Sequence, residues 1–73
     1  MNAQAPNRVR SEIIAFARLA RTQSRLSVQY RHWSQQAAAE GKLNLADRWR
    51  AESRRLRIEA SWHISMAMRR ADA

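Results

Sequence analysis

One stretch in the middle of the chain decides the fold: Ala37–Ala46, with the sequence AAAEGKLNLA. It contains Gly41, the only glycine in the 73 residues. Glycine readily adopts the left-handed conformation with which many helices end. Asn44, three residues later, is a residue type that caps a following helix. The stretch therefore predicts two helices joined by a tight turn at residues 41–43.

The flanking sequence is helical in pattern on both sides of this turn. No helix breaker occurs from Arg8 to Glu40, and Pro6 with Asn7 is typical of a helix start, with Asn7 or Ser11 as the cap. We expect one helix over about residues 7–40, a second over about 44–70, and a frayed tail over residues 1–5. Because the link is short, the helices should pack antiparallel, so residues 1–73 form a single helical-hairpin domain.

Composition excludes most other architectures. One glycine and one proline are too few turn residues for an all-β fold. The absence of cysteine excludes disulfides and thiolate metal sites, and two histidines are too few for a structural zinc site, so no metal or cofactor is predicted. A chain this small usually needs further support, and oligomerisation remains. We therefore expect an all-α, long antiparallel two-helix hairpin that dimerises into a four-helix assembly.

Apolar residues recur at helical spacing and predict the core. On the first helix the stripe consists of Phe16, Leu19, Gln23, Leu26, Tyr30, Trp33 and Ala37, extended by Val9 and Ile13 and widened by Ala20. On the second helix it consists of Leu45, Trp49, Leu56, Ala60, His63, Ile64 and Ala67. The hairpin core is predicted where these two stripes meet.

The second helix carries another apolar stripe, formed by Ala51, Ile58, Trp62 and Met66. A helix in a lone hairpin buries only one face, and monomers rarely expose a patch of this kind. Tryptophan and arginine dominate the energetics of protein interfaces, and methionine adapts to irregular partners. The predicted partner-binding residues are Arg55, Ile58, Trp62, Met66 and Arg69. Whether this stripe is the homodimer core or an external binding site stays open at this point.

Charge suggests a second kind of partner. The formal net charge is +8, and 13 of the 14 basic residues are arginine. This bias fits either a demand for phosphate or carboxylate contacts or a GC-rich genome. Arg18, Arg21 and Arg25 share one side of the first helix and form a candidate face for nucleic acid or an acidic partner. On the second helix the arginines point in several directions, and Glu52 and Glu59 interrupt them.

Catalysis and membrane insertion are not indicated. Two thin helices provide no enclosed pocket, and Glu59 with His63, four residues apart, is interpreted as a side-chain pair at the edge of the core. The longest stretch without Asp, Glu, Lys or Arg runs only from Ala60 to Met68, too short to span a bilayer, and residues 1–10 lack the apolar core of a secretory signal. We expect a cytoplasmic protein that is not an enzyme and has no membrane partner.

Residues 30–46, with small Ala37, Ala38 and Ala46 around the turn glycine, resemble the helix-turn-helix unit of tetratricopeptide-type hairpins. The chain departs from that family in having no second copy of the unit and no closing proline. The resemblance implies a hairpin and a protein-binding role. In size and helical build the chain is also similar to bacteriophage and mobile-element accessory proteins, some of which, such as anti-quorum-sensing and anti-CRISPR proteins, block a host regulator or defence complex.

The predicted function is that of a small non-enzymatic adaptor or inhibitor that binds another protein. A phage or mobile-element accessory protein of this kind would block a host regulator, such as a transcription factor, or a defence complex. The alternative is a non-specific nucleic-acid-binding protein that uses the arginine-rich helix face. Predicted partners are a second copy of the chain, another protein and, on the alternative, nucleic acid.

Overall fold

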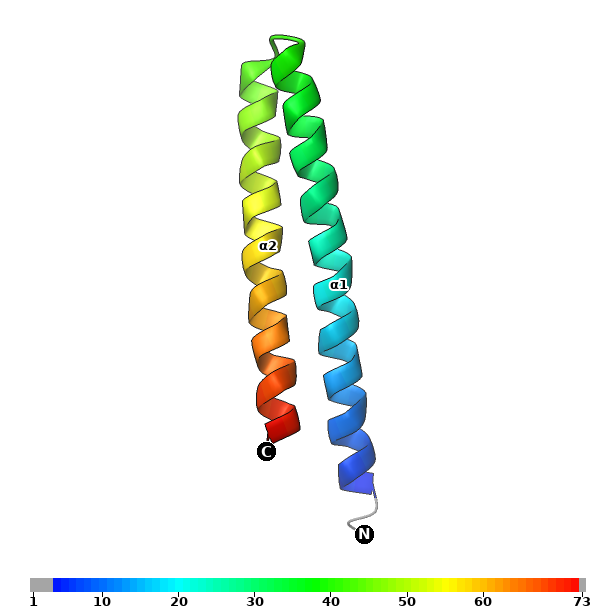
Figure 1. Ribbon diagram of the computed structural model, residues 1–73. Coiled ribbons are helices and arrows are strands. Elements are labelled where there is room, and N and C mark those ends of the chain that lie inside the picture. The colour runs from blue at the N-terminus through cyan, green and yellow to red at the C-terminus, as the bar shows by residue number, and fades with distance from the viewer. Residues whose placement is uncertain (1–3, 73) are drawn as a thin grey trace.

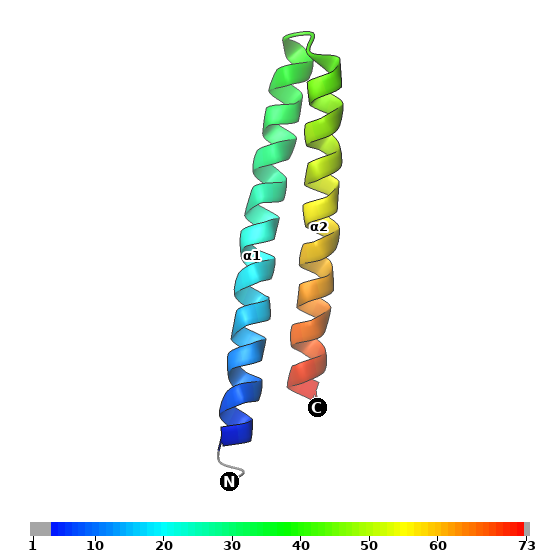
Figure 2. The same ribbon diagram turned by 180° about the vertical axis from the view of Figure 1, so that it is seen from behind.

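The computed structural model describes residues 4–72, with side chains from residue 7 onward, and in that range the chain is a pair of α-helices. Helix α1 spans Gln4–Ala39 and helix α2 spans Leu43–Asp72. The helices lie side by side, both termini are at the end opposite the turn, and α1 extends beyond the end of α2 (Figure 1; Figure 2 shows the same from behind). The Cα atoms extend over 60 × 13 × 12 Å. The predicted all-α hairpin is confirmed.

Gly41 ends α1 as predicted. Its φ of 77° lies in the left-handed region that favours glycine. The amide of Gly41 donates to the carbonyl of Ala38 (3.0 Å), and the amide of Lys42 donates to the carbonyl of Ala37 (2.8 Å). This pair of bonds is the Schellman motif, which satisfies the last carbonyls of a helix.

The second helix begins earlier than its predicted cap. The carbonyl of Lys42 accepts the amide of Ala46 at 2.9 Å, so the helical hydrogen bonds of α2 start directly after the turn glycine. Asn44 therefore lies inside the first turn of α2, and its predicted role as the cap is wrong. The connection is as short as the Schellman turn allows.

The first helix also begins earlier than predicted. Since α1 starts at Gln4, Asn7 lies in its first turn and Ser11 in its second, and neither caps the helix. Pro6 is tolerated because an amide in the first turn has no partner within the helix in any case. Of the predicted frayed tail, Gln4 and Ala5 are helical, and residues 1–3 lie outside the described part of the chain.

Small side chains form the seam between the helices. The buried residues of α1 are Ala20, Gln23, Ser27, Ser34 and Ala37, and those of α2 are Ala46, Ser53, Leu56 and Ala60. With the half-buried Ile13, Phe16 and Tyr30 on α1 and Trp49, His63 and Ala67 on α2, they alternate spacings of three and four residues. This is the heptad pattern of a coiled coil. Its a positions are 13, 20, 27 and 34 on α1 and 46, 53, 60 and 67 on α2, and each d position follows three residues later.

The predicted core stripe of α1 is wrong at three positions. Leu19 is 44% exposed, Leu26 42% and Trp33 36%. Their places in the seam are taken by the next residues along the chain, Ala20, Ser27 and Ser34. Small residues let two helices approach closely, and larger side chains are displaced to the edge of the contact. Val9 is also exposed.

On α2 the predicted stripe is largely confirmed. Leu56 and Ala60 are buried, and Leu45, Trp49, His63 and Ala67 are half-buried. Ile64, by contrast, is exposed, and the prediction missed Ala46 and Ser53, which are buried.

Serine hydroxyls bond across the seam. Ser27 Oγ donates to the carbonyl of Ser53 (2.9 Å), and Ser53 Oγ donates to the carbonyl of Ser27 (2.7 Å). Nearer the turn, Ser34 Oγ donates to the carbonyl of Ala46 (2.7 Å). Because α1 and α2 run in opposite directions, residues of the two helices whose numbers add to about 80 lie at the same height along the hairpin.

The hairpin buries little apolar surface of its own. Leu56 is the one buried residue larger than alanine that is hydrophobic, among the side chains that the structure describes. Eleven large hydrophobic side chains are more than a third exposed, six on α1 and five on α2. Burial of a large side chain typically stabilises a fold by ~1.5–3 kcal/mol. The single hairpin therefore lacks most of the stabilisation that burial of these side chains would supply.

Candidate interaction surfaces

The seam divides the hairpin into two sides. The residue before each a position lies on one side, and the residue after each d position lies on the other. A contact between the helices shows where the first side lies. The ring of Trp33, which precedes an a position of α1, is tilted against the ring of Trp49 of α2, with ring centroids 5.9 Å apart. We name this side the aromatic face. Its members are Phe16, Leu19, Leu26, Tyr30, Trp33, Leu45, Trp49, Trp62 and Met66.

All five aromatic residues of the chain belong to the aromatic face. Near the turn, Tyr30 meets Trp33 edge to face at 5.2 Å between ring centroids, as aromatic pairs prefer. Trp33, Trp49 and Leu45 line an open hollow of about 290 Å³. This hollow is at the lower end of the ~300–1,000 Å³ range of small-molecule sites and is open to solvent, so it suits a single protruding side chain.

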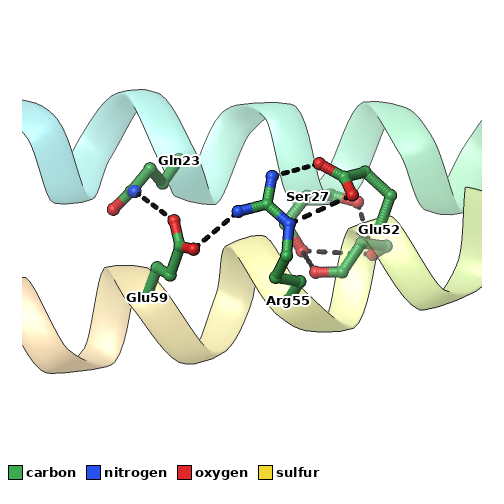
Figure 3. A network of polar contacts seen from close by, with 6 residues as sticks. Gln23, Ser27, Glu52, Arg55 and Glu59 are labelled. Carbon is green, nitrogen blue, oxygen red and sulfur yellow. Dashed lines mark hydrogen bonds and ion pairs between the residues drawn. The ribbon is translucent and has the colours of Figure 1, made fainter.

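A polar network occupies the middle of the aromatic face (Figure 3). The guanidinium of Arg55 lies between two carboxylates and pairs with Glu52 and with Glu59, the latter at 2.5 Å. Hydrogen bonding to Arg55 holds the pKa of Glu52 below its ordinary value, and the two carboxylates raise the pKa of Arg55. Arg55, a predicted partner-binding residue, is therefore engaged within its own helix.

Gln23 joins this network to the opposite helix. Its Nε2 donates to Glu59 (2.9 Å), so its Oε1 faces His63 and accepts a hydrogen bond from the Nδ1 of that ring (2.7 Å). The nitrogen Nδ1 of His63 therefore carries a proton in this arrangement. The expected pairing of Glu59 with His63 is replaced by a bridge through Gln23.

A second aromatic cluster lies toward the open end. His63 stacks on Phe16 of α1 with ring centroids 6.0 Å apart and meets Trp62 edge to face at 5.0 Å. Trp62 nevertheless stays 57% exposed, whereas Met66 is half-buried. The aromatic face thus has an apolar cluster at each end of the polar network.

The predicted partner-binding residues follow one another along α2 at spacings of three or four residues, so they share a face that runs from the outer side of α2 to the aromatic face. Trp62 and Met66 belong to the aromatic face, and Arg69 is exposed on the same side. Ile58 is 63% exposed but points away from the seam, on the outer side of α2. The prediction of an apolar surface outside the hairpin core agrees with the exposure of Ile58 and Trp62, while Met66 is partly covered by the hairpin itself.

Sequence reasoning missed the apolar row on α1. Leu19, Leu26 and Trp33 follow one another at seven-residue intervals, and all three are exposed along the aromatic face. The helical spacing predicts them in the core because they share a stripe with Phe16 and Tyr30. The signal that separates them is the run of small residues Ala20, Ser27 and Ser34, directly after each of the three.

The other side of the hairpin carries arginine. We name it the basic face, formed by Arg21, Arg31, Arg50, Arg54 and Arg57. Arg18 and Arg25, predicted with Arg21 as a basic face, are exposed on the outer surface of α1 next to it. All four glutamates of the chain lie on the opposite, aromatic side. Glu12 pairs there with Arg70 (3.1 Å), and Glu40 borders the hollow near the turn.

Neither surface resembles a metal site or a membrane span. Within residues 4–72 no three His, Cys, Asp or Glu side chains are grouped so that they could hold a metal ion. Over the same residues neither helix contains an apolar stretch long enough to cross a membrane. Comparison of the chain with protein-family models, with curated proteins and with solved structures found no match.

Proposed function

We propose that the chain is a small non-enzymatic protein-binding protein, an adaptor or inhibitor, and that the aromatic face is the surface with which it binds an amphipathic helix. The observation that carries this proposal is the row of Leu19, Leu26 and Trp33, exposed at heptad spacing beside two aromatic clusters. Apolar residues at this spacing are the anchors with which one helix packs along another. In the isolated protein the partner helices are those of a second copy.

Charge favours a second copy on this face. Each hairpin has a formal charge of +8, so two hairpins repel one another through most orientations. The aromatic face carries all four glutamates, and at its centre Arg55 is neutralised by Glu52 and Glu59. Contact through the aromatic face therefore brings together the surfaces with the least repulsion.

The aromatic face is also complementary to itself. A two-fold axis at the height of Leu26 would set Leu26 against its copy and Leu19 against Trp33 of the second hairpin. Trp62 lies at the height of residue 18 of α1, eight residues from Leu26, and the residues that line the hollow beside Trp33 and Trp49 are centred about ten residues on the other side of Leu26. At ~1.5 Å per residue, Trp62 is about 12 Å from the axis and the centre of the hollow about 15 Å, a difference that the length of an indole side chain spans. Trp62 of each copy would thus enter the hollow of the other.

The result is an antiparallel four-helix assembly with an isologous interface. Burial of Leu19, Leu26, Trp33 and Trp62 from both copies would supply the large apolar contacts that the single hairpin lacks. An external protein with an amphipathic helix of the same pattern would compete for the same face.

Sedimentation velocity over a range of concentrations tests the proposal. We expect the wild-type chain to form dimers, and Leu26→Gln to weaken them by ~2 kcal/mol or more, because the substitution falls twice at the centre of the interface. The matched control is Val28→Gln, two residues away on the other side, where the side chain is 57% exposed.

The same pair of variants serves as bait with an extract of the source organism. A partner retained by the wild type and by Val28→Gln but lost with Leu26→Gln supports an adaptor or inhibitor role. A chain that stays monomeric at every concentration and retains nothing through Leu26 would refute the proposed function.

A further inference from the structure

The basic face is a second surface with a different chemistry, and its role does not depend on the proposed function of the aromatic face. Its arginines are all exposed, and none of them pairs with a carboxylate in the described part of the chain. The ion pairs that do form within residues 7–72 lie at the turn or on the aromatic side. The excess positive charge of the molecule is therefore concentrated opposite the glutamates.

Two arginines flank the seam at the same height, and neither pairs with a carboxylate among the described residues. Arg31 follows Tyr30 and Arg50 follows Trp49, so both flank the seam on the same side and lie at the same height. Like charges at such positions destabilise a helix pair. The neighbouring seam-flanking residues on α1, Ser24 and Ala38, are small. A bound anion would relieve this repulsion.

The density of charge fits a phosphate backbone. The five arginines of the basic face lie between the heights of residues 21 and 31 of α1, a length of ~15 Å at ~1.5 Å per residue. Double-stranded DNA carries one charge per ~1.7 Å of its axis, so the same length presents about nine phosphates. Arginine binds phosphate in a bidentate manner. Arg18 and Arg25 extend the surface around α1.

We propose that the basic face binds the phosphate backbone of a nucleic acid without reading its sequence. The straight, 60 Å long hairpin would lie along the strand. Asp47 is the one acidic residue beside these arginines on α2, and it forms no ion pair among the described residues. Its carboxylate repels phosphate, so removing the charge of Asp47 should strengthen binding, whereas removing an arginine should weaken it.

Fluorescence anisotropy with a labelled DNA duplex of about 20 base pairs, long enough for the 60 Å hairpin, tests the proposal. A single strand and an RNA duplex of the same sequence form the other arms and show which source of phosphate is preferred. We expect binding that weakens steeply between ~50 and ~200 mM salt. Arg31→Gln with Arg50→Gln should weaken it by ~10-fold or more at ~0.1 M salt and lower the salt slope by about 2.

The matched control is Arg8→Gln with Arg48→Gln. Arg48 borders a hollow with Tyr30 and Glu52 on the aromatic side. Arg8 lies one turn before Glu12 on that side. This variant removes the same charge from the opposite side and should change the affinity less than about threefold. Asp47→Asn should tighten binding by about threefold. Circular dichroism of each variant verifies that the helices are retained. The proposal is overturned by an absence of binding at ~50 mM salt, by equal losses in both double variants, or by binding to anionic phospholipid vesicles alone.

Discussion

The two sides of the hairpin share one helical backbone but differ in aromatic content and in charge. The aromatic face holds all five aromatic residues and all four glutamates, whereas the basic face holds five arginines and none of the glutamates. Both faces follow from the small residues that occupy the seam between the helices. Because Ala20, Ser27 and Ser34 occupy the seam, the residues before them, Leu19, Leu26 and Trp33, fall on one side. Arg31, Arg50 and Arg57, which follow d positions, fall on the other. A core of small residues thus leaves the large side chains outside the seam, the apolar ones on one side and the arginines on the other.

The largest expected effect contrasts two exposed apolar residues of α2. Trp62→Ala removes the side chain that would enter the hollow of a second copy, and it does so twice per dimer, so we expect a loss of ~4 kcal/mol in dimer stability at ~2 kcal/mol for each anchor. Met68→Ala, on the other side and 61% exposed, should leave the dimer unchanged. Sedimentation equilibrium measures both. Equal effects of the two substitutions would erase the distinction between the faces.

The next contrast tests the register from which both faces arise. Ala20 is 2% exposed opposite the equally buried Ala60, so Ala20→Leu should destabilise the fold by ~1–3 kcal/mol through overpacking. Leu19→Ala, at the edge of the seam, should cost less than ~1 kcal/mol in a monomeric sample. Chemical denaturation followed by circular dichroism gives both values. The reverse order would place Leu19 in the core and contradict the structure.

The chain sequence predicted the hairpin because the signals for it are local. Gly41 favours the left-handed conformation in which a helix ends, and the single proline, Pro6, lies in the first turn of α1, where it is tolerated. The register could not be predicted in the same way, because Leu19 and Ala20 are both apolar and differ by only 100° around the helix. Which of them enters the seam depends on the partner helix, where Ser53 and Ala60 offer space for close approach. The cap at Asn44 failed for a similar reason, since the Schellman turn brings α2 to its start before Asn44.

A smaller effect concerns the serines of the seam. Ser53→Ala deletes the hydroxyl that donates to the carbonyl of Ser27, and we expect a loss of about 1 kcal/mol in the free energy of unfolding. Ser65→Ala is the control, since its hydroxyl is exposed and bonds only to the carbonyl of Ser61 in its own helix. Alanine is the better helix former there, so this variant should be as stable as the wild type or slightly more so.

The smallest effect is the pH dependence of the Glu52–Arg55 pair on the aromatic face. The pKa of Glu52 is lowered in the folded chain, so the pair stabilises the fold fully above the ordinary pKa of about 4.5 and loses its effect as pH falls through the lowered value. The difference in Tm between the wild type and Glu52→Gln should therefore shrink below about pH 4.5. In an Arg55→Gln background that pH dependence should disappear.

The register of the seam can be measured directly, because the chain contains no cysteine. The hydroxyls of Ser27 and Ser53 lie 3.2 Å apart, so cysteines at both positions should form an intramolecular disulfide on mild oxidation. A chain with Leu26→Cys and Ser53→Cys should stay reduced under the same conditions, because residue 26 points to the aromatic face. Mass spectrometry of the oxidised monomers reads out both. Rapid bridging from residue 26 but not from residue 27 would contradict the small-residue seam and, with it, the division of the hairpin into two faces.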